Sequence, residues 1–265
     1  MMANIVNSDD VPILKSKFQA MKKDDLFIFK SPEDLANNFA DQLMSWIESL
    51  SGKVFNLAIS GGKTPDLLFT SLTLKYANSK IWQKVHFWWV DERMVPSNNP
   101  ESNFGVAKRL LFSQISIPEE NIHRIKGENT PENEALSYSS QIQEKLPSQN
   151  GWPVFDLILL GMGDDGHTAS IFPDQMHLLD SRHICELAAQ PFSGQRRVTL
   201  TGKAIINASK VCFLITGSNK AERLGEIWHN PEKAKLLPAA QIHLTNGNLL
   251  WFVDEQAAKN ISQTI

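Results

Sequence analysis

The chain has 265 residues, with 26 Lys and Arg against 29 Asp and Glu, a formal charge of −3 at pH 7 and 42% hydrophobic residues. This is the composition of an ordinary globular protein, and it excludes a disordered chain, a collagen-like repeat and a polybasic nucleic-acid binder. The two cysteines, Cys185 and Cys212, have no second Cys at metal-ligand spacing, so we expect neither a disulfide scaffold nor a zinc ribbon.

The start of the chain shows no pattern of an export signal, because residues 1–10 lack a basic segment followed by an apolar one. The longest apolar runs, such as 249–253, are far shorter than the about 20 residues that a membrane helix needs. We therefore expect a soluble, cytoplasmic protein without membrane or nucleic-acid partners. Residues 1–24 are interpreted as an N-terminal arm, and residues 25–265 as a single α/β domain.

Short β-branched and aromatic runs alternate with stretches that favour helices, which is typical of an α/β protein with a parallel sheet. Several runs are apolar throughout, as expected when helices cover both faces of the sheet. We predict an open, mostly parallel, Rossmann-like sheet with helices on both faces and room for a small extra lobe. The expected strands are 26–29, 54–59, 85–90, 155–160, 211–216 and 249–253, and the expected helices are 32–50, 131–146 and 219–228.

The polar stretch 147–153 lies between the second expected helix and the strand that follows it. Its composition is rich in residues that favour turns. It is either a lobe boundary or a long loop.

The loop after the second predicted strand, residues 60–65, has the sequence Ser-Gly-Gly-Lys-Thr-Pro. Gly61 and Gly62 allow backbone amides to approach a ligand, while Ser60 and Thr64 supply hydroxyl groups. Thr64 and the proline after it are predicted to cap and begin a helix, whose free amides favour phosphate. The alternative is a plain tight turn. The loop lacks the Gly-Lys-Ser/Thr ending of a nucleotide P-loop, which argues against a nucleoside triphosphate.

The loop at 161–168 has the sequence Gly-Met-Gly-Asp-Asp-Gly-His-Thr and formally contains G-x-G-x-x-G, with Asp180 about 20 residues after it. A dinucleotide site is rejected because two carboxylates would face the pyrophosphate, and because Pro173 interrupts the following helix. We interpret the loop as one that presents Asp165 and His167, an acid that orients a base. The alternative, a structural histidine, is the commoner case in a chain with seven histidines.

Further charged residues follow other predicted strands. Asp91 and Arg93 lie in an Asp-Glu-Arg run after the strand at 85–90, with a solvated turn as the alternative. Arg197 precedes Val-Thr-Leu-Thr, and Lys220 follows Gly-Ser-Asn after another strand. Each cation alone is typical of a surface, but three of them beside a glycine-rich helix N-terminus indicate a phosphorylated, anionic substrate.

In order and spacing, these motifs resemble those of the 6-phosphogluconolactonase family, over about residues 25–255. The resemblance implies the fold of the glucosamine-6-phosphate isomerase superfamily, known as the NagB type. It also implies hydrolysis of 6-phosphoglucono-1,5-lactone to 6-phosphogluconate in the oxidative pentose phosphate pathway, without a metal or an organic cofactor. The motifs stand at 60–65, at 90–93 (Val-Asp-Glu-Arg) with Val-Pro at 95–96 and Ser-Asn at 102–103 beyond it, at 161–173, at 197–201 and at 217–221.

The resemblance also implies roles for single residues. His167 would be the general base that takes a proton from the attacking water, and Asp165 would orient it or hold substrate hydroxyl groups. The partner would be a small sugar-phosphate lactone, and we expect a monomer while leaving an oligomer open. The expected contacts with substrate, phosphate or oxyanion are Ser60, Gly61, Gly62, Thr64, Asp91, Arg93, Arg197 and Lys220.

Two other functions are compatible with the same motifs. Glucosamine-6-phosphate deaminase/isomerase shares both loops, but its histidine is followed by Phe-Asn-Glu, whereas residues 168–173 here contain no acid before Asp174. A non-catalytic sugar-phosphate sensor would carry a helix-turn-helix module and a basic surface, and the residues before Leu26 are too few and too polar for one. The sequence therefore favours the lactonase.

Overall fold

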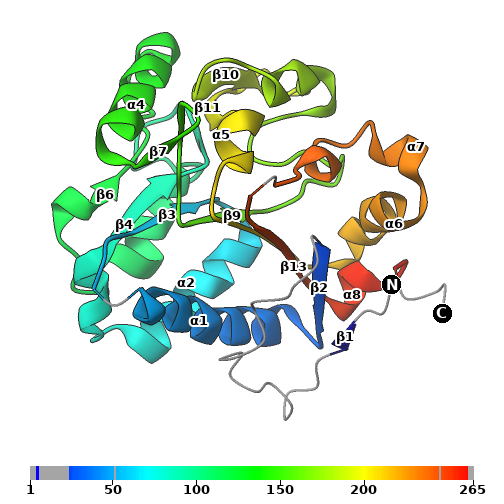
Figure 1. Cartoon of the computed structure of the whole chain (residues 1–265), viewed down its shortest axis with the longest axis horizontal. Coiled ribbons are helices and arrows are strands. Elements are labelled where there is room, and N and C mark those ends of the chain that lie inside the picture. Colours follow the sequence, from blue (N-terminus) through cyan, green and yellow to red (C-terminus); the bar gives the residue numbers. More distant parts are fainter. Residues whose placement is uncertain (1–3, 6–23, 51, 245, 262–265) are drawn as a thin grey trace.

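The computed structural model describes residues 4–5, 24–50, 52–244 and 246–261. Its centre is an eight-stranded sheet in which every hydrogen-bonded pair of strands is parallel (Figure 1). All six strands expected from the sequence lie in this sheet. In spatial order the strands are β1 (Asn4–Ile5), β2 (Asp24–Phe29), β13 (Asn248–Asp254), β12 (Lys210–Ile215), β9 (Leu157–Leu160), β3 (Phe55–Ile59), β4 (Val85–Trp89) and β6 (Ile122–His123).

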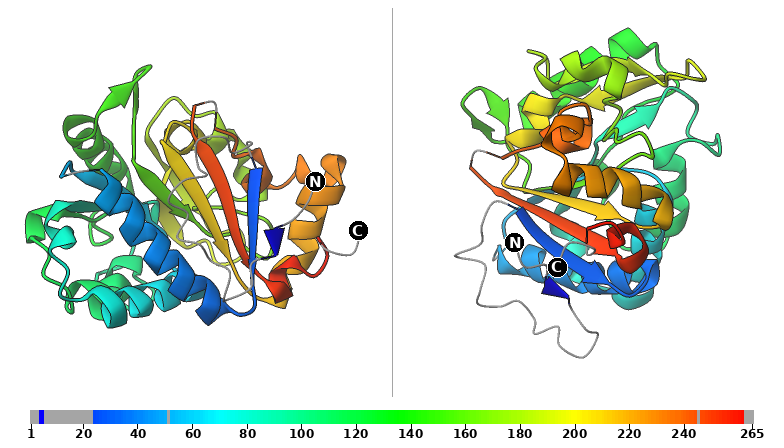
Figure 2. Two further views of the ribbon diagram at one scale, coloured as in Figure 1. Left: turned by 60° about the horizontal axis from the view of Figure 1, so that its bottom comes forward. Right: turned by 90° about the vertical axis from the view of Figure 1, so that its right-hand side faces the viewer.

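Helices cover both faces of this sheet, as predicted. Figure 2 shows α1 on one side of the strands and α6 on the other. Ser31 caps the N-terminus of α1, because its Oγ accepts a hydrogen bond from the Asp34 amide at 3.1 Å. The helices are α1 (Pro32–Ser49), α2 (Lys63–Tyr76), α3 (Asn103–Ala107), α4 (Pro131–Lys145), α5 (Gly202–Ile206), α6 (Ala221–His229), α7 (Pro231–Ala234) and α8 (Glu255–Ala258).

Short 3₁₀ segments and one π-helical segment occur between these elements in the described part of the chain. One of them, Ser218–Lys220, leads directly into α6, so the helix expected at 219–228 is confirmed in its position but begins as a 3₁₀ turn. The segment Lys108–Phe112 continues α3 as a π-helix. The remaining 3₁₀ turns are Lys80–Lys84, Glu119–Asn121, Pro173–Leu179 and Pro238–Gln241.

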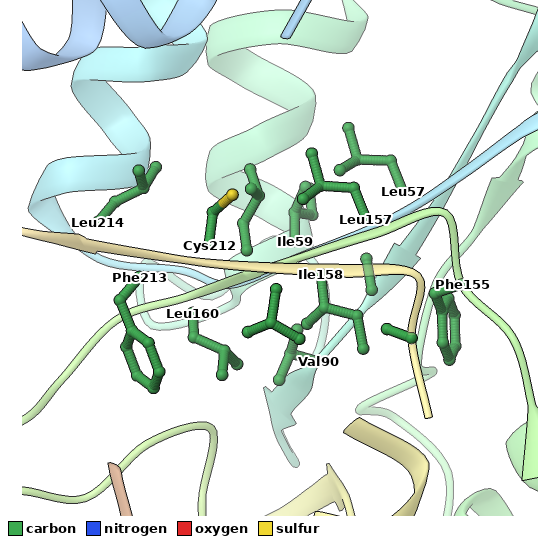
Figure 3. Close-up of a cluster of buried hydrophobic side chains, with 14 of the residues drawn as sticks. Leu57, Ile59, Val90, Phe155, Leu157, Ile158, Leu160, Cys212, Phe213 and Leu214 are labelled. Carbon is green, nitrogen blue, oxygen red and sulfur yellow. The ribbon is translucent and has the colours of Figure 1, made fainter. Parts of the chain in front are cut away.

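The core lies on both faces of the central strands. Residues of β9 alternate between the two faces, so Leu157 points to one side and Ile158 and Leu160 to the other (Figure 3). Both Leu157 and Ile158 are fully buried. A strand that is covered on both faces has no solvent side, which explains why the sequence of β9 is apolar throughout.

A second, three-stranded antiparallel sheet has the order β10-β11-β5 and provides the small extra lobe that the sequence left room for. Its strands are β10 (Cys185–Ala189), β11 (Arg196–Leu200) and β5 (Asp91–Arg93). Val90 connects the two sheets, because its amide donates to the Ile59 carbonyl at 2.9 Å and its carbonyl accepts from the Leu200 amide at 2.7 Å. The solvated turn considered for 91–93 is therefore wrong: this segment is a strand.

The polar stretch 147–153 is neither a lobe boundary nor a plain loop. It forms a two-stranded hairpin of β7 (Ser148–Gln149) and β8 (Trp152–Pro153). The predicted N-terminal arm falls mostly outside the described residues, and within it Asn4–Ile5 pairs in parallel with β2. None of the helices in the described part of the chain has the length and the apolar character that spanning a membrane requires.

Candidate active site

A pocket of about 230 Å³ lies where the loops after β3, β9 and β12 meet the three-stranded sheet. This is the position at which open parallel sheets bind ligands, beyond the carboxyl ends of their strands. Seven of the residues predicted for the site line it. The lining consists of Ser60, Gly61, Asp91, Arg93, Asn103, Gly161, Met162, Gly163, His167, Ala169, Arg197 and Lys220.

The loop after β9 holds His167 against Asp165. The distance from His167 Nδ1 to Asp165 Oδ1 is 2.6 Å, and the same oxygen accepts a hydrogen bond from the His167 amide at 3.0 Å. Burial is the largest single influence and raises the pKa of Asp165, but the hydrogen bonds and the charge interaction with His167 together outweigh it, so the pKa lies below its usual value. A carboxylate beside Nδ1 keeps the proton of a neutral imidazole there, which leaves the Nε2 lone pair free to accept a proton.

Glycine at position 163 allows this arrangement. A Cβ on Gly163 would lie 2.1 Å from His167 Nδ1, so no other residue fits beside the ring in its present place. The backbone closes the loop on itself, since the Gly163 amide donates to the His167 carbonyl at 2.8 Å. Thr168 fixes the far end, donating from Oγ1 to the Gly161 carbonyl at 2.9 Å.

Two arginines from the small sheet face the same pocket. Arg93 on β5 and Arg197 on β11 are direct partners in the antiparallel register. Arg197 Nη1 lies 3.8 Å from Asp91 Oδ2, which also accepts a hydrogen bond from Ser170 Oγ at 2.6 Å. Burial lowers the pKa of Arg197, and the Asp91 carboxylate opposes that effect. The Nε atoms of both arginines are buried without a hydrogen-bond partner among the described residues, as expected of donors reserved for an anion.

Glu92 is not among the predicted site residues, and its side chain ties β5 to the start of α3. It is 1% exposed, and its carboxylate accepts hydrogen bonds at 2.8 Å from the backbone amides of Arg93, Asn103 and Phe104. Burial raises the pKa of Glu92, while these backbone donors lower it. An Asp-Glu-Arg run reads equally well as a solvated turn, so only the structure reveals that its middle carboxylate is buried.

Asn103 is a pocket residue to which sequence reasoning assigned no role. Its Nδ2 donates to the Asp91 carbonyl at 2.9 Å, which fixes the side chain across the pocket wall. A Cβ on Gly61 would lie 2.0 Å from Asn103 Oδ1, so Gly61 is required by this close contact. Two sequence signals were available: Ser102 and Asn103 belong to the motif that follows 90–93, and Asn103 follows a Ser that caps a helix, since Ser102 Oγ accepts from the Gly105 amide.

Three of the predicted residues do not line the pocket: Gly62, Thr64 and Asp165. The predicted helix start is also wrong, because α2 begins at Lys63 and its cap is Gly62, whose φ of 118° makes the turn. The Thr64 hydroxyl caps nothing and instead lies 2.7 Å from the hydroxyl of Thr216. Asp165 acts on the pocket through His167. Lys220, by contrast, reaches the pocket from the turn after β12 and forms an ion pair with Asp164.

Fold and site together define an α/β protein that places a carboxylate-oriented histidine beside cations suited to a phosphorylated ligand. A family model described as glucosamine-6-phosphate isomerases/6-phosphogluconolactonase matches residues 30–251. The chain belongs to this family.

Individual relatives agree with this assignment. The chain is 45% identical to a 6-phosphogluconolactonase of Haemophilus influenzae over 205 residues, which make up 77% of this chain and 86% of that protein. A solved structure named devB protein is 41% identical, with a TM-score of 0.86, and the match covers 90% of this chain and 100% of that one. The 6-phosphogluconolactonase of Trypanosoma brucei is 26% identical, with a TM-score of 0.79 and coverages of 92% and 100%.

Proposed function

We propose that this chain hydrolyses 6-phosphoglucono-1,5-lactone to 6-phosphogluconate. The observation that carries the proposal is the 45% identity, over most of both chains, to a protein named 6-phosphogluconolactonase. The site supports it, because His167 and three cations line one pocket, with Asp165 behind the histidine. Such a set suits the hydrolysis of a phosphorylated ester.

The reaction needs a base, and His167 is the group suited to that role. Its Nε2 takes a proton from water while the water oxygen forms a bond to the lactone carbonyl carbon. The bond from that carbon to the ring oxygen then breaks, and the imidazolium returns its proton to the departing ring oxygen. Asp165 stabilises the imidazolium in between. The new carboxylic acid releases its own proton to solvent, so the charges balance.

The cations have two tasks in this scheme, holding the phosphate and stabilising the negative oxygen that develops at the carbonyl carbon. Arg93 and Arg197 supply buried Nε donors, which suit the fixed geometry of a phosphate group. Lys220 enters the pocket from the segment after β12. We assign all three to substrate binding, together with the backbone of Ser60 and Gly61 in the same wall.

The second candidate, a deaminase/isomerase reaction, lacks an acid in the segment after the histidine. Between His167 and Pro173 the polar side chains are Thr168, which bonds the Gly161 carbonyl, and Ser170, which bonds Asp91. Neither can relay a proton as a carboxylate would. A sugar-phosphate sensor would bind the ligand without turnover, so it is separated from the lactonase by the activity measurement itself.

The test is to generate the lactone in place from glucose 6-phosphate and follow the formation of 6-phosphogluconate above the spontaneous rate. His167→Ala is the informative variant, and His177→Ala is the matched control, since His177 is exposed and lies outside the pocket lining. We expect acceleration by the wild type and the control, and at least about a tenfold loss of kcat in His167→Ala with an unchanged circular dichroism spectrum.

Wild-type turnover in His167→Ala would remove this residue from the role of base. No acceleration by the wild type would argue against the lactonase, and glucosamine 6-phosphate would then be tried as the substrate. Absence of turnover with both, together with binding of a sugar phosphate, would favour the sensor. A cytoplasmic location, a monomeric state and the lack of nucleic-acid or membrane partners stay predictions.

A further inference from the structure

Asp164 joins the histidine loop to the segment after β12. Its Oδ1 accepts a hydrogen bond from Asn219 Nδ2 at 2.7 Å and forms an ion pair with Lys220 Nζ. Its backbone carbonyl accepts from Arg223 Nε at 3.3 Å. The hydrolysis scheme gives no task to this carboxylate, although it is bonded to a cation of the pocket.

The cations of the pocket are already partly compensated in the protein without a ligand. Arg197 lies 3.8 Å from the Asp91 carboxylate, and Lys220 is paired with Asp164. Arg93, in contrast, donates from Nη1 to a neutral backbone carbonyl at 2.8 Å. A phosphate dianion that enters the pocket therefore competes with a carboxylate for two of these three cations.

The two carboxylates differ in how firmly they are held. The Asp91 side chain is 7% exposed and is fixed by Ser170, whereas the Asp164 side chain is 68% exposed and Lys220 is 18% exposed. The hydrogen bond from Lys220 lowers the pKa of Asp164, so this carboxylate is charged at neutral pH. The charge of Asp164 can be removed without leaving a buried group unpaired, so Asp164 is the simpler of the two carboxylates to test.

We propose that Asp164 is a positioning residue that sets the affinity of the site for phosphorylated ligands, an inference that rests on the proposed function. Its carboxylate holds the Lys220 ammonium at the pocket wall and at the same time offsets part of its charge. The affinity of the pocket for a dianionic ligand is lower as a result. A lower affinity favours release of a product that carries both a phosphate and a new carboxylate.

The test uses Asp164→Asn, which keeps an oxygen that accepts from Asn219 and Lys220 but removes the charge. Binding of 6-phosphogluconate and of inorganic phosphate is measured by calorimetry, at low ionic strength and again in about 0.5 M salt, where charges are screened beyond about 4 Å. The same substitution is made in a Lys220→Met background. Glu222→Gln is the matched control, since it removes an equal charge from an exposed residue two positions after Lys220.

We expect Asp164→Asn to bind both anions about threefold or more tightly at low salt, with a lower KM and no gain in kcat, a size typical of a single exposed ion pair. This gain in affinity should shrink in high salt, vanish in the Lys220→Met background and be absent in Glu222→Gln. Asp164→Glu should restore wild-type affinity.

Unchanged or weaker anion binding by Asp164→Asn would overturn the proposal. A gain in affinity that persists in the Lys220→Met background would overturn it too. A wild type that binds neither anion would overturn it as well. The proposed function fails separately. If the wild type shows no lactonase activity, but Asp164→Asn still binds phosphate more tightly than the wild type does, the role of Asp164 stands and only the lactonase is refuted.

Discussion

Replacing Gly163 by Ala tests whether the close approach of the histidine ring to the loop backbone matters for activity. The new Cβ would lie 2.1 Å from His167 Nδ1 and 2.6 Å from Asp165 Oδ1, whereas ordinary contact begins at 3.4 Å. The imidazole must therefore retreat by about 1.3 Å. A misplacement of about 1 Å costs about 100-fold in rate when a reacting group must be aligned. We expect kcat to fall about 100-fold, with a smaller change in KM.

The free energy of unfolding should change less than the activation free energy, for which a 100-fold loss of rate corresponds to about 2.7 kcal/mol. Gly163 does not adopt a positive φ, so alanine causes no backbone strain there and lowers the entropy of the unfolded chain. The clash with the ring opposes this gain by about 1–3 kcal/mol. We therefore expect the free energy of unfolding to change by less than about 2 kcal/mol, as measured by urea titration.

The control is Gly161→Ala in the same loop, where a Cβ meets nothing within 4 Å. Steady-state kinetics of both variants, with the lactone generated in place, measure the effect. We expect Gly161→Ala to lose much less activity than Gly163→Ala. A Gly163→Ala enzyme with a native spectrum and a kcat within about twofold of wild type would refute the argument, because the ring could then move without consequence.

Three more substitutions probe single interactions. Asp165→Asn should lower kcat at least about tenfold, because an amide can donate to Nδ1 and reverse the tautomer of His167; a pH-rate profile like that of wild type would contradict this. Arg197→Ala should raise KM more than it lowers kcat, since a phosphate contact is made in ground and transition states alike; an effect confined to kcat would place Arg197 at the reacting carbon. His123 has a pKa lowered to about 4, by burial and by His86, so the folded state disfavours its protonation. Its contribution to stability is therefore complete above pH 6.5 and lost as pH falls toward 4, and His123→Phe should flatten that part of the urea midpoint curve; an unchanged curve would assign the acid sensitivity elsewhere.

The central sheet could be predicted from the sequence because its strands are fully covered. A strand such as β9, buried on both faces, must be apolar at every position, and that leaves a direct signal. The loops after these strands were located for the same reason. The positions of His167 and Asp165 in such a loop could be predicted too, because glycines and charged residues directly after an apolar strand are a local pattern.

The small sheet left no such signal. β5 has three charged residues, and their burial depends on partners that are distant in sequence, such as Thr199 opposite Asp91. The start of α2 was misplaced because Thr-Pro is a common helix start, whereas here the positive φ of Gly62 makes the turn earlier. The register that sets Arg93 beside Arg197, and the contact of Asn103 with Gly61, are products of tertiary packing that periodicity does not encode.

Val90 has a mechanical consequence for the site. It is a single residue between β4 and β5, and its backbone is hydrogen-bonded to the large sheet on one side and to the small sheet on the other. No linker separates the two sheets at this point, so the lobe that carries both arginines cannot swing as an independent body about it. The walls of the pocket are therefore held together without a ligand, and a ligand that binds there would not have to offset the entropy that closing a hinged lobe costs.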